Sequence, residues 1–255
     1  DTAEVGNMQL DYVGHCGRST GGEYLHTISA VDIASSWWEG EPILGRSQHV
    51  TEAGLKEIRR RLPFRLREIH PDNDTGLLND LIWRCCRKWR VKVSRSRPYQ
   101  KNDNAWVEQR NWTHVRQVVG YSRLETAKQQ ALLRELYAAL RLYKNFFQPV
   151  LKLKEKVRVE GRIQRRYEKA RTPYQRLLDS GQLTAAARRR LEAQYAQLNV
   201  AELRRTIQEL QNRLWNTLAA GGDASVRPRR RGPAPSLSGV AHKLWMKRMM
   251  AGEAA

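Results

Sequence analysis

Cysteine is scarce in this chain, and its spacing excludes two classes of protein. The 255 residues include three cysteines, Cys16, Cys85 and Cys86, and they form no C-x-x-C pair. An odd number without paired spacing argues against a disulfide framework and against a structural zinc site. We therefore expect a protein of a reducing compartment.

Long apolar runs are also lacking. No stretch of about 18 apolar residues occurs, and no signal-like segment opens the chain, so we expect a cytoplasmic protein without membrane association. The first residue is Asp1 rather than Met, and we expect that an N-terminal region is missing.

Acidic residues are few beside basic ones. The chain has 26 Asp and Glu against 46 Lys and Arg, a net charge of +20, and a pI of about 10.4. Residues 151–255 hold 23 Lys and Arg against 9 Asp and Glu, which leaves +14 there and +6 in residues 1–150. A balance of this kind favours a polyanionic partner. Ribosomal and membrane-surface proteins share it, so charge alone does not select DNA.

Three of the acids stand in distinctive settings. Asp11 ends the apolar-alternating part of MQLDYVGHCG, Asp72 follows a strand-like run in LREIHPDND, and Glu108 lies in the helix-like stretch NDNAWVEQRNW. The interval 73–107 between the last two has 107 − 73 + 1 = 35 residues. Clustered carboxylates suit Mg²⁺, and two such ions about 4 Å apart can stabilise the attacking and leaving oxygens of a phosphodiester exchange.

This order and spacing resemble the D,D-35-E signature of retroviral-type integrases and of related bacterial insertion-sequence transposases. LDYVGHCG resembles the first-strand motif of the integrase core, VDIASSWWEG its next two strands, and SRPYQKNDNAWVEQRNW the loop and helix that deliver the glutamate. Farther on, LRLYKNFFQPVLKL and ARTPYQRLLDSG are similar to segments that follow the core in the transposases. The resemblance covers about residues 5–180. The family's zinc-binding His-His-Cys-Cys module is not present in this chain.

The segment IHPDND departs from the family's His-Ser-Asp-Asn-Gly motif. Pro71 stands in place of Ser and Asp74 in place of Gly. A glycine would allow a tight turn after the strand, whereas Asp74 adds a fourth carboxylate nearby. Both interpretations of Asp74, as a turn residue and as an extra ligand, stay open.

The resemblance implies an α/β fold of the RNase H-like class, a five-stranded mixed sheet with flanking helices. Periodicity alone predicts only a mixed α/β order. It gives strands in 7–43, a helix from Gln48 that Pro63 stops, a strand over 65–70, a helix with an apolar stripe from Leu78 to Trp89, a strand at VKVS, the Glu108 helix and a long helix over 124–147. We expect a catalytic core over 1–149, a helical basic region over 150–220 and a basic flexible tail over 221–255.

The region after the core is predicted to be helical, without a small β-barrel. Residues 150–171 are densely charged and expected to be exposed. Two helices follow, which we interpret as an antiparallel hairpin. The second has an apolar stripe from Leu203 to Leu218 and a capping box of Asn199 and Glu202. The stripe is expected to contact the core or another subunit.

By resemblance, the catalytic and metal-binding residues are Asp11, Asp72 and Glu108, which would hold two Mg²⁺ ions, with Mn²⁺ as a substitute. Asp32 matches the family's noncatalytic aspartate, so we expect a structural role for it. His15 and His70 stand near catalytic acids, yet packing is the expected role of both. Of Trp106 and Trp112, which flank Glu108, one is expected to face DNA and one to pack in the core.

Seven basic residues are candidate phosphate contacts, with a solvated charged face as the alternative: Arg95, Arg97, Lys101, Arg110, Arg229, Arg230 and Arg231.

The resemblance implies a DDE transposase or integrase that cuts DNA 3′ ends and joins them to a target in a metal-dependent reaction. Its partners would be element ends and target DNA. We expect a homo-oligomer at the bacterial nucleoid, because two element ends must be held at once. Two alternatives stay open: an RNase H-like nuclease without strand transfer, and a noncatalytic DNA-binding or targeting subunit that keeps the fold.

Overall fold

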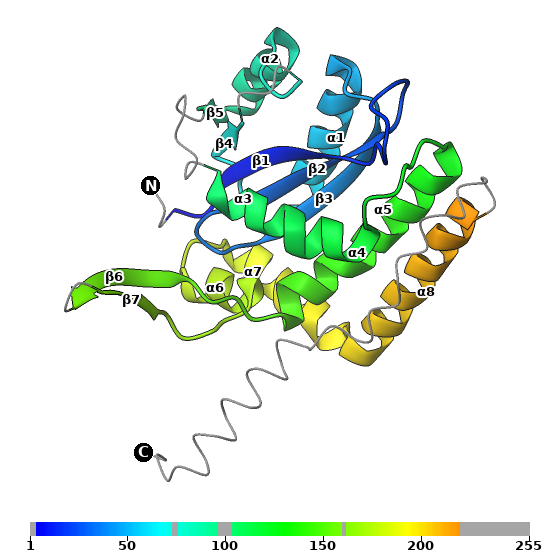
Figure 1. Cartoon of the computed structure of the whole chain (residues 1–255). Coiled ribbons are helices and arrows are strands. Elements are labelled where there is room, and N and C mark those ends of the chain that lie inside the picture. Colours follow the sequence, from blue (N-terminus) through cyan, green and yellow to red (C-terminus); the bar gives the residue numbers. More distant parts are fainter. Residues whose placement is uncertain (1–3, 73–75, 96–103, 160–161, 220–255) are drawn as a thin grey trace.

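The computed structural model describes residues 4–72, 76–95, 104–159 and 162–219. Its centre is a five-stranded mixed sheet in the order β3-β2-β1-β4-β5 (Figure 1). The first three strands are antiparallel, and β4 and β5 run parallel to β1. The predicted α/β class with an RNase H-like sheet is therefore confirmed. The strands are β1 (Asn7–Gly14), β2 (Leu25–Asp32), β3 (Trp38–Leu44), β4 (Glu68–Pro71) and β5 (Lys92–Val93).

Helices cover both faces of this sheet, which explains why β2 is buried along its whole length. Because strand side chains alternate, Met8 and Leu10 of β1 face one layer, whereas Val13 faces the other. The first layer holds α1 (Gln48–Arg61) and α2 (Asp80–Trp89). The second holds α3 (Ala105–Arg110), the π-helical turn η1 (Asn111–Arg116), α4 (Gln117–Val119) and α5 (Ala127–Leu142).

The helix ends follow from local sequence. Ser47 caps α1 by accepting a hydrogen bond from the backbone N of Val50. Leu62 ends α1 in an extended conformation with φ −64° and ψ 133°, as expected for a residue before proline. Thr126 and Gln129 form a capping box at the start of α5. The predicted helix over 124–147 thus begins at Ala127 and continues after Leu142 as a π-helical turn, η2 (Tyr143–Phe147).

The region after the core contains a β-hairpin that the sequence interpretation missed. Strands β6 (Leu153–Val159) and β7 (Arg162–Tyr167) pair antiparallel with each other and project from the rest of the chain (Figure 1). The expected exposure of this segment holds, because its described side chains are largely exposed. The described part of 150–219 contains these two strands and three helices, and not a five-stranded barrel.

Those three helices are α6 (Pro173–Asp179), α7 (Ala185–Gln197) and α8 (Val200–Ala219). Leu210 and Leu214 of α8 are buried in the same cluster as the apolar face of α5, and α8 lies along α5 in Figure 1. Leu191 of α7 instead packs with Trp37 and Phe146. The two helices join different clusters, so the expected antiparallel hairpin does not form. Within the described ranges, no helix has the length and apolar character needed to cross a membrane.

Candidate active site beside strands β1 and β4

Two of the three predicted acids lie side by side on neighbouring strands, Asp11 within β1 and Asp72 directly after β4. Strands β1 and β4 run parallel, and Leu10 pairs with Pro71 in their last register position. The backbone N of Asp72 then donates to the Leu10 carbonyl at 3.3 Å. Asp11 and Asp72 therefore follow matched positions of adjacent strands. Asp11 is half-buried, and Asp72 is exposed.

The third acid lies on α3, whose start is fixed to β1 by Gln9. The side-chain oxygen of Gln9 accepts hydrogen bonds of 3.1 Å from the backbone N of Trp106 and of Val107. Asn104, the residue at the usual capping position, makes no side-chain cap. Gln9 lies on β1 and is 3 % exposed, and its side chain accepts the hydrogen bonds that a local capping residue of α3 would otherwise accept. Because strand side chains alternate, Gln9 and Asp11 point to the same face, toward α3.

One helical turn connects Glu108 to Asn111, and Asn111 contacts Asp11. Residues three apart share a helix face, so Glu108 and Asn111 lie on the same side of this segment. Nδ2 of Asn111 donates to Oδ2 of Asp11 at 2.7 Å. The exposed Glu108 side chain is thus on the helix face that is directed at Asp11 of β1.

The charges of Asp72 and Glu108 act on the carboxyl group of Asp11. Burial raises the pKa of Asp11 from 3.8 to about 6, and the negative charges of Asp72 and Glu108 act in the same direction. Hydrogen bonds from the Tyr12 backbone N, at 2.7 Å, and from Asn111 oppose this rise. A cation placed among these groups would relieve the repulsion and favour the ionised form of Asp11.

The donor set fits a hard divalent cation, because all three groups supply carboxylate oxygens. In the part of the chain that the structure describes, however, no three His, Cys, Asp or Glu side chains stand close enough together to hold a metal. Asp72 and Glu108 are exposed, so their side chains can turn without repacking the core. The charges of Asp72 and Glu108 reach Asp11, but as they are placed the three acids do not form a metal-binding group.

Arg110 requires a correction. We predicted a phosphate contact, but this side chain is 5 % exposed, and burial lowers its pKa to about 10. Its Nε and Nη2 atoms have no hydrogen-bond partner. The reason is helical geometry, because two residues of α-helix turn the chain by about 200° and direct Arg110 away from the side that carries Glu108. Arg95 is exposed, whereas Asp74, Arg97, Lys101, Arg229, Arg230 and Arg231 lie outside the described residues.

Asp32 has the contacts expected of a structural residue. Its carboxylate accepts hydrogen bonds from the Gly6 backbone N at 2.7 Å and from the Ser35 backbone N at 2.7 Å. The Ser35 hydroxyl donates to it at 2.5 Å. Gly6 has φ +106°, and a Cβ there would lie 2.3 Å from the Arg65 carbonyl, so the loop that Asp32 holds requires glycine.

The histidines and tryptophans near the acids divide between core and surface. His15 is fully buried beside the Thr27 hydroxyl at 2.8 Å, and burial lowers its pKa to about 3. His70 is partly buried and contacts the Ser94 hydroxyl at 2.8 Å. Trp106 packs against the core, whereas Trp112 is 52 % exposed. Trp112 is therefore the tryptophan of this pair that solvent or a ligand can reach.

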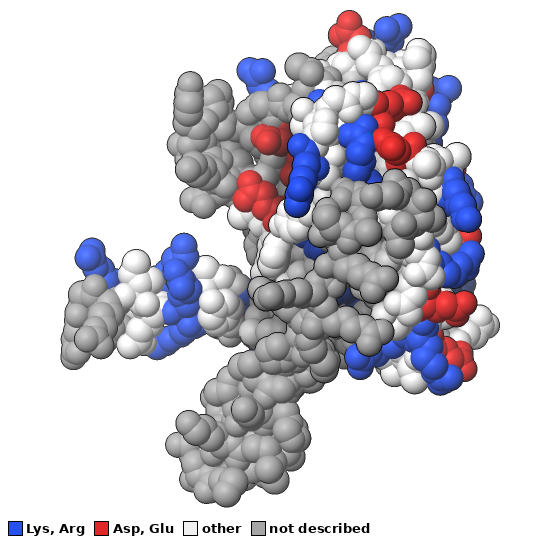
Figure 2. All heavy atoms as spheres, turned by 45° about the vertical axis from the view of Figure 1, so that its right-hand side comes forward, with Lys and Arg blue, Asp and Glu red and all other residues white. Residues whose placement is uncertain are grey.

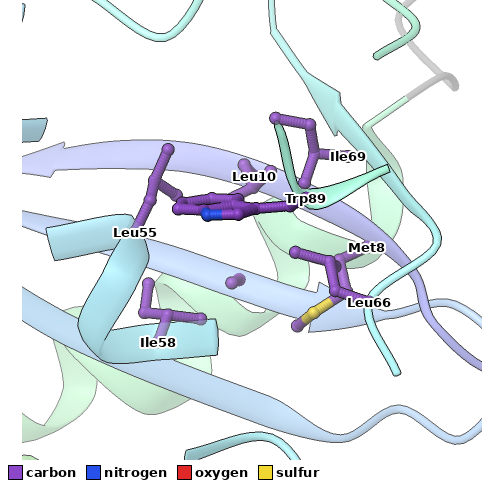
Figure 3. A pocket seen from close by; sticks show the side chains of 8 residues that line it. Met8, Leu10, Leu55, Ile58, Leu66, Ile69 and Trp89 are labelled. Carbon is purple, nitrogen blue, oxygen red and sulfur yellow. The ribbon is translucent and has the colours of Figure 1, made fainter. Parts of the chain in front are cut away.

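A small apolar pocket lies between the sheet and the other helical layer (Figure 3). It is lined by Met8, Leu10, Ala30, Leu55, Ile58, Leu66, Ile69 and Trp89. Met8 and Leu10 alternate with Gln9 and Asp11, so this pocket opens on the face of β1 opposite to the acids. Its lining offers almost no polar atoms to a ligand, and we interpret it as core packing space.

Sequence reasoning missed two residues that hold the site together, Gln9 and Asn111. The signals were present, since Gln9 precedes Asp11 by two residues and Asn111 follows Glu108 by three. Residues two apart in a strand share a face, so Gln9 lies on the same face as Asp11. Residues three apart in a helix also share a face, so Asn111 lies on the same face as Glu108.

The comparisons with known proteins find distant or partial similarity. No protein-family model matches the chain. It is 42 % identical over 162 residues to the uncharacterized protein y4rM of Sinorhizobium fredii, a match of 64 % of this chain and 46 % of that protein. The chain thus spans about half the length of this relative. Among solved structures it is similar to the catalytic core domain of BIV integrase, with a TM-score of 0.44, 16 % identity and coverage of 69 % of this chain and 95 % of that one. A likeness at this level says nothing about chemistry, and the fold class stands on the strand order and register described above.

Proposed function

We propose that this chain is the catalytic part of a DDE-type DNA transposase or integrase. The observation that supports the proposal is that Asp11 on β1 lies beside Asp72 after β4, contacts the helical segment that carries Glu108, and has its pKa raised by both of these acids. The order of the sequence motifs and the excess of Lys and Arg support a DNA substrate. We expect a homo-oligomer that holds element ends and target DNA.

The proposed reaction has two steps at one site. First, water attacks a phosphodiester at an element end, the bond to the 3′ oxygen breaks, and a 3′-hydroxyl is released. That hydroxyl then attacks a phosphodiester of target DNA, forms a new P–O bond and expels the 3′ oxygen of the target strand. Asp11, Asp72 and Glu108 would hold two Mg²⁺ ions, which lower the pKa of the attacking group and stabilise charge on the phosphate.

The protein residues contribute position. Asn111 and the Tyr12 backbone N each donate to one oxygen of Asp11, so the carboxylate is oriented before a metal arrives. Gln9 fixes the start of the helix that carries Glu108. Catalysis of this kind depends on prearranged charge and position rather than on a protein nucleophile.

The test is a strand-transfer assay with Mg²⁺, a plasmid target and short duplexes copied from any inverted repeats that flank the gene. We expect cut ends and joined products with the wild-type chain and neither with Asp11→Asn or Glu108→Gln. Glu57→Gln is the matched control, because Glu57 is a partly exposed acid on α1, in the layer opposite to the site. Cutting without joining would support a nuclease instead. DNA binding without either product would support a noncatalytic subunit.

A further inference from the structure

We propose that the β6–β7 hairpin is a DNA-binding ribbon, one face of which contacts the backbone of duplex DNA. This inference rests on the proposed function and assigns a DNA contact that lies outside the acidic site. The hairpin projects from the rest of the chain (Figure 1), and Figure 2 shows Lys and Arg along its described part, with no acidic side chain on the visible face.

The root of the hairpin is held firmly. Val150 and Arg171 form a backbone bridge, in which the Val150 N donates to the Arg171 carbonyl at 2.8 Å. Lys152 is 8 % exposed, and its Nζ donates to the Ile33 carbonyl at 2.6 Å and to the Ala34 carbonyl. These contacts join the hairpin root to the turn after β2. The ribbon therefore extends from a fixed base.

The pairing register separates the hairpin into two faces of different character. Opposed residues share a face, and every second residue along a strand returns to it. Leu153 pairs with Tyr167, Lys156 with Arg165, and Arg158 with Ile163. A register shift between Leu153 and Glu155 brings Leu153 opposite Tyr167, so it joins this face although three positions separate it from Lys156. We call these six residues the cationic face. It combines three positive charges with exposed apolar side chains, and none of its members is acidic.

The opposite face is balanced. Glu155 pairs with Arg166, and the two side chains form an ion pair at 3.1 Å. Val157 pairs with Gln164 on the same side. The charges of this face therefore satisfy each other, at least among the residues whose side chains are described, whereas those of the cationic face repel.

Energetics favour an anionic occupant for the cationic face. A two-stranded hairpin is marginally stable alone in water, and like charges directly opposite each other, such as Lys156 and Arg165, weaken it further. Bound phosphates would offset this repulsion. A second copy of the chain is a poorer occupant, because each copy carries a net charge of +20.

The shape of the hairpin suits a duplex. Paired strands lie about 4.8 Å apart, and the major groove of DNA, about 12 Å wide, admits a two-stranded ribbon with its side chains. In that position Lys156, Arg158 and Arg165 would contact phosphates. Ile163, which is 64 % exposed, and Tyr167, which is 51 % exposed, would cover apolar parts of the sugars and bases. Most of these contacts carry no sequence information, so we expect nonspecific binding.

The test compares Arg165→Gln with Arg166→Gln. The two residues are neighbours on β7, each substitution removes one positive charge, and only Arg165 lies on the cationic face. Affinity for a duplex of arbitrary sequence is measured by fluorescence anisotropy in EDTA, over about 50 to 200 mM salt. We expect Arg165→Gln to weaken binding about five- to tenfold near 0.1 M salt and to reduce the log–log salt slope by about 0.9, as for one lost phosphate contact. Arg166→Gln should change affinity by less than about twofold, because Arg166 lies beside Glu155 on the face turned away from the bound duplex.

If both variants weaken DNA binding equally, affinity depends on net charge and not on the cationic face. If neither variant changes affinity, the hairpin does not bind DNA. Either result overturns the proposal. A lower oligomer mass for Arg165→Gln in sedimentation would assign this face to a second copy instead, which also overturns it. Circular dichroism and thermal unfolding check that both variants fold. Because binding is measured without metal, it is independent of catalysis. If Asp11→Asn remains active while Arg165→Gln behaves as expected, the proposed function fails and the ribbon stands.

Discussion

The side-chain amide of Asn111 donates a 2.7 Å hydrogen bond to Oδ2 of Asp11, across 100 positions of sequence. The Tyr12 backbone N donates to the other oxygen of the same carboxylate at 2.7 Å. Both oxygens of Asp11 are therefore oriented, one by its own strand and one by the helical segment that also carries Glu108. This contact couples the position of the helix to the ionisation of Asp11, because hydrogen bonds to a carboxylate favour its charged form.

Asn111→Leu should impair the proposed reaction by displacing Asp11. Burial and the two neighbouring carboxylates raise the pKa of Asp11, and hydrogen bonds from Tyr12 and Asn111 lower it. Without the Asn111 amide, one of these two hydrogen bonds is lost, so the pKa of Asp11 rises above about 6. Groups that orient metal ligands typically contribute about 10- to 100-fold to activity or metal affinity, and we expect a loss in that range. The check is the pH dependence of DNA cleavage, whose acidic limb should shift to higher pH.

The neighbouring residue Gln109 offers the control for this variant, since it lies on the same helix and its side chain is exposed. Gln109→Leu should leave both the rate and the pH profile close to wild type. An Asn111→Leu profile that has the wild-type limb at a reduced rate would indicate general loss of structure rather than an effect on Asp11.

Asp11→Asn should stabilise the metal-free protein at neutral pH. The pKa of the Asp11 carboxyl is about 6 in the folded chain and 3.8 for the unperturbed group, which represents the unfolded chain. The folded state therefore binds this proton more tightly than the unfolded state. The contribution of this group to stability is therefore present below pH 4 and is lost as the pH rises toward 6 and beyond. An amide has no such loss. Urea unfolding in EDTA should show the variant more stable than wild type at pH 7 by on the order of 1 kcal/mol, with the difference shrinking near pH 4.

Divalent metal should reverse that order of stability. If the three acids hold a metal, Mg²⁺ or Mn²⁺ binds the folded state alone and stabilises it by about 1.4 kcal/mol when its concentration is ten times Kd. Thermal unfolding of the wild-type chain should therefore shift upward on addition of metal, and that of Glu57→Gln should shift equally. Asp11→Asn and Glu108→Gln should show no shift. A shift of wild-type size in both acid variants would place any metal elsewhere.

The sequence could predict the first four strands because each of them has buried apolar positions, and it could predict the end of α1 because Pro63 follows it. Asp11 and Asp72 were predictable as a pair because each follows an apolar run that forms part of a strand. The β6–β7 hairpin was not predictable in the same way. Its alternation is between charged and apolar residues that stay exposed, as with Ile163, so no buried stripe marks it.

Two other misses have tertiary causes. Arg110 is as polar as the residues around it, and only the turn of α3 against β1 sends it into the interior. The apolar stripe of helix α8 contacts α5, which confirms the expected contact with the core, whereas the expected pairing of α8 with α7 was wrong. Spacing identifies which face of a helix is apolar, but not which surface will cover it.

Gln9→Leu should misplace Glu108 without touching any acid. Gln9 is buried and accepts hydrogen bonds from the Trp106 and Val107 backbone N atoms, so leucine leaves two buried donors without that acceptor. We expect a loss of about 1–3 kcal/mol in the free energy of unfolding, measured by urea denaturation. DNA cleavage at a temperature where the variant is fully folded should fall by a larger factor than DNA affinity.

Gln9→Glu retains a side-chain oxygen that can accept both bonds, so it should recover most of the stability. It should recover less of the activity, because a fourth negative charge would lie on the same face of β1 as Asp11. Full activity in Gln9→Leu would show that the helix reaches its place without this contact.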